Sequence, residues 1–151
     1  MNFTKQPRLF FGDQVPAMQN VVDLAVNDDD LYLLRSDGSL TVCYYSSMDV
    51  SPTRCDDPIQ YIDSRPGRES GYLILDSLFD QIYFAPPPDP SLYLLDPANQ
   101  AVFHFSLRLN FQQQYRSARE IPEGQVSAFT VSSDRLIFMA VKNEVFFAVL
   151  P

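Results

Sequence analysis

The stretch Leu31-Tyr32-Leu33-Leu34 recurs letter for letter at Leu92-Tyr93-Leu94-Leu95. A polar turn and a second β-rich run follow each copy, which is the pattern of a β-hairpin. A third copy by residue type, Leu136-Ile137-Phe138-Met139-Ala140, precedes the turn at Lys142-Asn143. The identical positions are apolar strand residues rather than groups that do chemistry. The repeat therefore predicts an architecture and not an activity.

Another short apolar run precedes each copy, at Leu24–Val26, Ile82–Phe84 and Phe129–Val131. Each unit is thus predicted to contain at least three strands joined by turns. The copies begin at residues 31, 92 and 136, so their spacings are 61 and 44 residues. The shorter spacing matches a four-stranded propeller blade of about 40–50 residues, and the longer one matches a blade with an insertion. We expect one domain, 1–151, with blade-like units at about 1–46, 47–107 and 108–151.

The turns between the repeated strands use residues that suit tight hairpins. Asp37-Gly38 supplies a glycine that accepts a positive φ, and Lys142-Asn143 is expected to use Asn for the same purpose. The run 96–99 (Asp-Pro-Ala-Asn) predicts a type I turn in which Asp96 bonds the backbone beyond it.

The alternation of apolar residues predicts which strand faces are buried. Across 101–107 the odd positions are apolar, while His104 and Ser106 occupy the opposite face, as in a strand with one face on a core. Leu31–Leu34 and Val145–Val149 are apolar on both faces, so both are expected to be central strands covered on both sides.

Length and composition indicate an all-β globular protein. The chain has 151 residues, 46% of them hydrophobic, and shows little helical periodicity. The favoured architecture is a β-propeller-like array of about three antiparallel four-stranded blades, and a compact β-barrel or sandwich is the alternative. The formal charge of −8 disfavours binding to nucleic acid or to an anionic membrane surface.

The chain is expected to be a soluble cytoplasmic protein. The start at 1–5 lacks the apolar core of a secretory signal, and no apolar run approaches the length that spans a bilayer. On that basis the two cysteines, Cys43 and Cys55, are expected to be reduced.

Candidate chemical groups are few, and none forms a recognisable site. His104 is the only histidine, so a catalytic triad or a histidine zinc site would have to include it. We expect instead that it lies on a polar face or in a groove and has a satisfied hydrogen bond. The run 28–30 (Asp-Asp-Asp) has the carboxylates that a calcium site uses. Consecutive carboxylates point in different directions, however, so a solvated turn is expected. Asp23, Asp76 and Asp80 stand near predicted strand entrances, and nothing in the sequence pairs them.

The run Pro86-Pro87-Pro88-Asp89-Pro90 has two interpretations. It suits a polyproline II segment that a partner reads, and it equally suits a rigid loop that blocks wrong strand pairing. We predict no catalytic, cofactor-binding or metal-binding residue and no cofactor.

The run from Leu92 to Ser106 (LYLLDPANQAVFHFS) resembles the blade signature of bacterial NHL-type β-propellers. In that signature a tyrosine strand, an Asp-x-x-Asn turn and an aromatic strand ending in Ser recur. The run Val126–Pro151 is similar to a terminal blade of this kind, and the resemblance covers most of the chain from about Val21. The first copy has 35–38 (Arg-Ser-Asp-Gly) in place of the Asp-x-x-Asn turn, and the third copy lacks it.

The resemblance implies a rigid platform that binds proteins or ligands. Some family relatives carry a metal-dependent lactonase site in the central channel, but their His, Glu, Asn and Asp ligands have no recognisable counterpart here. We therefore expect a non-enzymatic binding or scaffolding module, with a metal-dependent hydrolase or lactonase-like enzyme as the alternative.

Three units are too few to close a propeller ring, which has 4–8 blades, so the end faces need a cover. A homodimer of two three-bladed halves and the completion of a larger propeller are the two expected solutions. Another protein partner is a further candidate.

Overall fold

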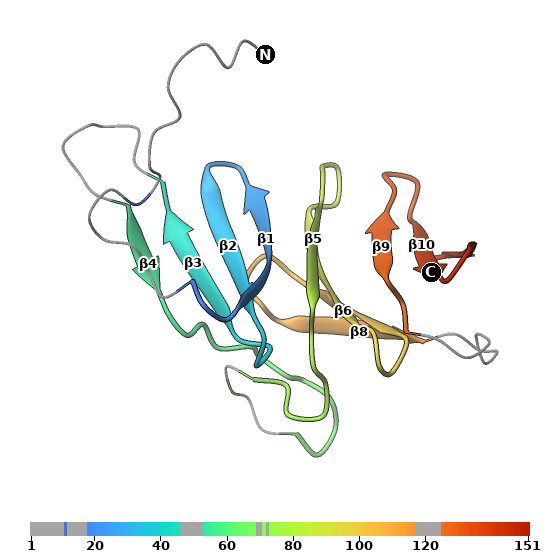
Figure 1. Ribbon diagram of the computed structural model, residues 1–151, viewed down its shortest axis with the longest axis horizontal. Coiled ribbons are helices and arrows are strands. Elements are labelled where there is room, and N and C mark those ends of the chain that lie inside the picture. The colour runs from blue at the N-terminus through green and yellow to red at the C-terminus, as the bar shows by residue number, and fades with distance from the viewer. Residues whose placement is uncertain (1–10, 12–17, 46–52, 69–70, 72, 117–124) are drawn as a thin grey trace, which may run out of the picture.

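The computed structural model describes residues 11, 18–45, 53–68, 71, 73–116 and 125–151. The regular elements in these residues are β-strands arranged in three antiparallel sheets (Figure 1). The all-β class is therefore confirmed. Among these residues no helix is long and apolar enough to cross a membrane.

Consecutive strands pair with one another within each sheet. The first sheet has the order β1 (Val21–Asn27), β2 (Asp30–Arg35), β3 (Leu40–Tyr44) and β4 (Arg54–Asp56). The second has the order β5 (Gln81–Ala85), β6 (Ser91–Asp96), β7 (Ala101–Phe105) and β8 (Phe111–Arg116). The third has the order β11 (Glu144–Val149), β10 (Leu136–Val141) and β9 (Ala128–Val131).

The predicted repeat corresponds to the second strand of each sheet, since its three copies are β2, β6 and β10. The first two sheets have the expected four strands, whereas the third has three in the described residues. The first two sheets also extend beyond the expected units, because β4 ends at residue 56 and β8 at residue 116 rather than near 46 and 107. Each sheet is open in these residues, so none forms a closed barrel.

The second sheet lies between the other two and is covered on both faces. Neighbouring residues of β6 enter two different cores, because successive strand side chains point to opposite faces. Leu92 and Leu94 join the core shared with the first sheet, whereas Tyr93 and Leu95 join the core shared with the third. Burial of one such side chain is worth about 1.5–3 kcal/mol. This double burial accounts for the uninterrupted apolar run of β6.

The segment that links the first two sheets closes their common core. Phe79 packs edge-on against Phe103, with ring centroids 5.0 Å apart, and Tyr61 is fully buried beside it. The Tyr61 hydroxyl donates a 3.0 Å hydrogen bond to the carbonyl of Gly38, which has φ +82°. The predicted turn at Asp37-Gly38 is confirmed, and it also receives this long-range contact.

The other two turns agree with the sequence to different degrees. Asp96 accepts hydrogen bonds from the backbone N–H of Asn99 at 3.1 Å and from its side-chain amide at 2.7 Å, as predicted. In the third hairpin the positive φ of 54° falls on Lys142 and not on Asn143. The left-handed conformation therefore occupies the first of the two turn residues.

The expectation of a covered central strand is right for β2 and wrong for β11. Leu33 and Leu34 of β2 are fully buried. In contrast, Val145, Phe147 and Val149 of β11 are 67%, 70% and 72% exposed. The physical reason is that, in the described residues, β11 pairs only with β10 and no sheet packs on its outer face.

Cys43 and Cys55 form a disulfide, so the expectation of reduced thiols is wrong. The two residues lie directly opposite each other on β3 and β4, with a Cα–Cα distance of 4.0 Å. Reduced thiols were expected from the cellular compartment, with Cys55 placed in a loop, whereas Cys55 lies in the three-residue strand β4, which brings the thiols together.

Candidate binding groove

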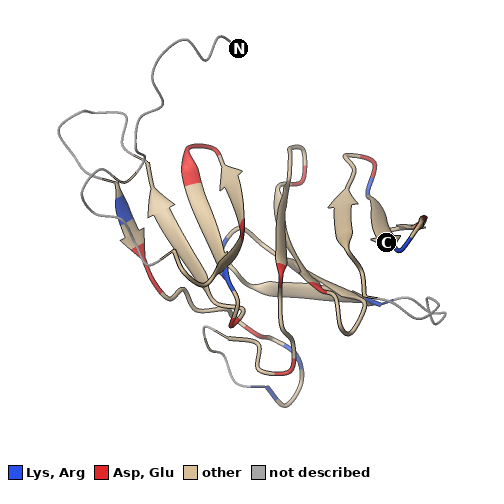
Figure 2. Cartoon of the chain, viewed as in Figure 1, with Lys and Arg blue, Asp and Glu red and all other residues tan. Residues whose placement is uncertain are grey.

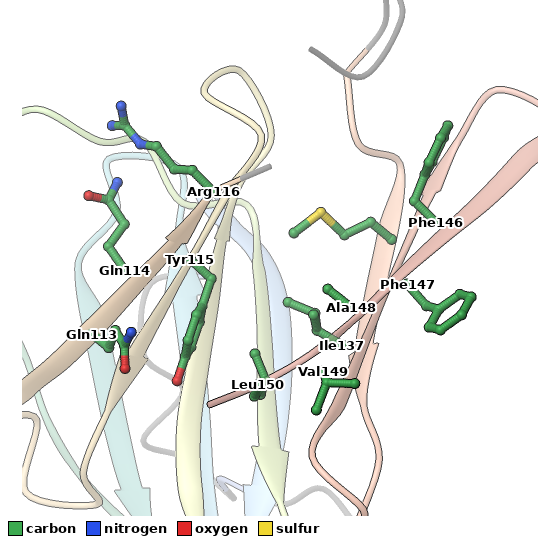
Figure 3. A pocket seen from close by; sticks show the side chains of 11 residues that line it. Gln113, Gln114, Tyr115, Arg116, Ile137, Phe146, Phe147, Ala148, Val149 and Leu150 are labelled. Carbon is green, nitrogen blue, oxygen red and sulfur yellow. The ribbon is translucent and has the colours of Figure 1, made fainter. Parts of the chain in front are cut away.

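A groove of about 370 Å³ lies between the last strand of the second sheet and the inner face of the third (Figure 3). One wall is formed by β8, and the other by β10, β11 and the residue after it. The lining residues are Gln113, Gln114, Tyr115, Arg116, Ile137, Met139, Phe146, Phe147, Ala148, Val149 and Leu150.

The register of β8 determines which of its side chains face the groove. Tyr115 pairs with Val102, which belongs to the core shared with the third sheet, so Tyr115 points toward that sheet. Arg116 pairs with Ala101 of the opposite core, so its side chain points away from β10 and β11 (Figure 3). This wall consequently presents an aromatic ring and uncharged polar groups.

The facing wall is apolar. Ile137 and Met139 are buried on the inner face of β10, and the register places Ala148 and Phe146 opposite them on β11. Ala148 is exposed, and its small side chain leaves the groove open at this point. The wall therefore suits apolar side chains.

The outer edge of β11 offers unpaired backbone groups beside the groove. The N–H of Leu150 donates a 2.7 Å hydrogen bond to the carbonyl of Arg135, the residue opposite it. Hydrogen-bonded pairs alternate along an antiparallel ladder, so Ala148 and Phe146 also bond β10. The N–H and C=O groups of the alternate residues, 145, 147 and 149, point to the free edge, where no described strand pairs with them.

His104 lies next to this groove in a stack of aromatic rings. It is half-buried on the face opposite Phe103 and Phe105, as predicted, and its ring stacks on Tyr93 at a centroid distance of 4.7 Å and an angle of 9°. Tyr115 lies on the neighbouring strand β8, and its ring centroid is 6.3 Å from that of His104. Burial lowers the pKa of His104 and raises that of Tyr93 to about 12. This arrangement favours a neutral imidazole that packs against its neighbours.

The three aspartates that the sequence singled out separate into two places. Asp23 accepts a 2.9 Å hydrogen bond from the backbone N–H of Ile82, and it lies near Asp80. Burial, together with the carboxylates of Asp23 and Asp96, raises the pKa of Asp80. Asp96 was not expected near Asp80, because the sequence indicated only its role in a turn.

Asp76 belongs instead to an ion-pair network in the segment that links the first two sheets. It contacts Arg65 at 2.9 Å and Arg68 at 3.0 Å, and Arg65 also contacts Asp63 at 2.6 Å. Hydrogen bonds from Arg65 lower the pKa values of Asp63 and Asp76. This network is a structural feature that sequence spacing alone did not show.

The remaining candidate segments lie at the surface. Asp28 and Asp29 form the exposed turn between β1 and β2, and the loop 86–90 is an exposed connection between β5 and β6. Across the described ranges no group of three or more His, Cys, Asp or Glu residues is placed to hold a metal ion.

Comparisons of the chain with protein-family models, curated proteins and solved structures found no match. The likeness to NHL-type propellers therefore remains a prediction from the sequence.

Proposed function

We propose that this chain is a non-enzymatic binding or scaffolding module built from propeller-type blades, and that it self-associates through its two end faces. The observation that carries the proposal is the exposure of apolar strand residues on the outer faces of both the first and the third sheet. Contiguous exposed apolar surface is a mark of an interaction site.

The arrangement of the sheets supports the blade interpretation. Each sheet is a meander, and the first strands β1, β5 and β9 lie side by side (Figure 1). Side-chain bonds link these strands: Asp23 accepts from the N–H of Ile82, and Gln81 donates to the carbonyl of Ser127 at 2.8 Å. Propeller blades surround their channel with their first strands in the same way.

The two end faces are both apolar but are built differently. On β1, Val22, Leu24 and Val26 are 46%, 55% and 58% exposed, because the alternate residues face the second sheet. At the other end the outer face of the third sheet carries the exposed residues of β11. β10 has no charged residue, and the charged residues of the third sheet lie at or next to its turns (Figure 2).

Different end faces favour head-to-tail contacts. When the first sheet of one copy covers the third sheet of another, a second contact of the same kind closes a two-fold ring. Such a dimer has six blade-like sheets, which lies within the range of closed propellers. Both apolar faces of each copy are then covered.

The mass of the protein in solution tests this proposal. Light scattering is expected to give twice the chain mass of 17.2 kDa. Leu24→Asp and Phe147→Asp each place a charge on one end face and should each give a monomer. Leu75→Asp is the matched control, because Leu75 is 90% exposed and lies in the segment between the first two sheets.

Mixing the two monomeric variants tests the head-to-tail geometry. The Leu24→Asp chain retains an intact third sheet and the Phe147→Asp chain an intact first sheet, so one contact forms again and a dimer reappears. A contact between like faces would instead leave at least one of the two variants dimeric on its own. A monomer for the unmodified protein at every concentration would refute self-association.

A further inference from the structure

We infer that the groove between β8 and β11 binds an extended strand of a partner protein, which pairs with β11 and becomes the fourth strand of the third sheet. The inference rests on the proposed function, because it names the kind of partner that the binding module takes.

The strand count of the three sheets points to this site. In the first two sheets a fourth strand, β4 or β8, pairs with the third strand. In the third sheet no described strand occupies the corresponding place beside β11. The groove lies at that place, and its far wall is the fourth strand of the neighbouring sheet.

β11 is an edge strand whose outward backbone groups can pair with another strand. Val145, Phe147 and Val149 direct their N–H and C=O groups to the free edge, as the bond between Leu150 and Arg135 establishes. An extended peptide satisfies such an edge by strand addition, with main-chain hydrogen bonds that supply affinity. We expect the peptide to run antiparallel to β11, because β4 runs antiparallel to β3 and β8 runs antiparallel to β7.

The side chains of the groove define the class of peptide. Residues of the incoming strand that lie opposite Phe146 and Ala148 point into the groove, because opposite residues share a face. There they meet Tyr115 on β8 and Met139 on β10. The charged group of Arg116 points away (Figure 3), so the two inward positions suit uncharged apolar residues. The partner segment is extended, spans about five residues and contains no proline at a pairing position.

A designed peptide tests the inference. The probe is a fluorescein-labelled seven-residue peptide of alternating Thr and Val with Lys at each end. The control has the same side chains but is N-methylated at the residues whose N–H groups would pair with β11. Fluorescence anisotropy should show binding of the first peptide and binding roughly tenfold weaker or more for the second, as expected for the loss of two hydrogen bonds.

Amide hydrogen exchange locates the bound strand. In the free protein the amides of Val145, Phe147 and Val149 should exchange fast, whereas those of Phe146 and Ala148 are already protected by β10. The peptide should slow the first three roughly tenfold or more, by giving them hydrogen-bond partners. Protection of these three amides without peptide would overturn the inference. Protection that appears only at high protein concentration would also overturn it, because a second copy would then be the occupant.

Two variants separate this inference from self-association. Ala148→Arg fills the groove and should abolish peptide binding while leaving the solution mass unchanged. Leu24→Asp changes the outer face of the first sheet and no residue that lines the groove, so its monomer should still bind the peptide. If that monomer fails to bind, or if Ala148→Arg binds normally, the inference is wrong whatever the mass shows. If the unmodified protein is monomeric and still binds, only the proposed self-association fails.

Discussion

Asp23 and Ile82 join the first strands of two consecutive sheets, since the aspartate carboxylate accepts a 2.9 Å hydrogen bond from the isoleucine N–H. β5 is the edge strand of the second sheet, so this N–H has no partner strand within its own sheet. A side chain from one sheet thus completes the backbone hydrogen bonding of the next.

Asp23→Ala should lower the free energy of unfolding by about 1–3 kcal/mol, because it leaves a partly buried N–H without a partner. Asp23→Asn keeps a carbonyl oxygen at the same position, and it should lose less. Urea unfolding at neutral pH measures both. Equal losses for the two variants would show that this hydrogen bond is not the cause.

Asp80→Asn should raise the melting temperature at pH 7. Burial and the neighbouring carboxylates raise the pKa of Asp80 above 3.8, and one of its oxygens is buried without a hydrogen-bond partner among the described residues. A raised pKa means that the folded state favours the protonated form, so stability falls as the pH rises through that pKa. The gain from Asn should therefore shrink toward about pH 2.5, well below the unfolded-state pKa, where the carboxyl is protonated in both states. Thermal scans at the two pH values give the comparison, and a gain that persists at low pH would contradict this account.

Arg65→Lys should lower the free energy of unfolding by about 1–2 kcal/mol at pH 7, because Lys keeps the charge but cannot form the forked contacts with Asp63 and Asp76. The guanidinium also lies 5.5 Å from the ring centre of Phe103. Both carboxylates have lowered pKa values, so their stabilisation is present above the unfolded-state pKa and is lost as the pH falls through the folded-state pKa. Urea titrations should show the difference between the proteins narrowing below about pH 4, near the unfolded-state pKa of Asp. If the difference in the free energy of unfolding did not change with pH, the effect of Arg65→Lys would come from packing alone.

Replacing both Cys43 and Cys55 by Ala should lower the free energy of unfolding by roughly 2–3 kcal/mol. The disulfide closes a loop between residues 12 positions apart, and the loss of this cross-link frees the unfolded chain. The same loss should appear when the unmodified protein is unfolded in urea with a reductant. A thiol assay under denaturing conditions without reductant checks the bond directly, since two free thiols would contradict it.

The features that the sequence predicted correctly depend on neighbouring residues. The apolar runs of β2, β6 and β10 and the turns at Gly38 and Asp96 have local physical causes, so spacing and residue type were sufficient. The positions of the fourth strands were not predicted, because their sequences are polar: β4 is Arg-Cys-Asp and β8 is Phe-Gln-Gln-Gln-Tyr-Arg. Neither shows the alternation that marks a half-buried strand.

The features that were missed depend on distant parts of the chain. Whether β11 is covered is decided by what packs on it and not by its own apolar residues. The groove joins Tyr115 to Ala148, and the carboxylate pair joins Asp23 to Asp80, across long separations in sequence. No local pattern carries that information.

The alternate placement of β6 side chains in two cores has a consequence for unfolding. Leu94 and Leu95 are neighbours in the chain, yet each stabilises a different pair of sheets. Loss of β6 exposes both interfaces at once, so neither outer sheet keeps its support when the middle one opens. The three repeats should therefore melt in a single cooperative transition, unlike linear repeat arrays whose terminal units fray independently.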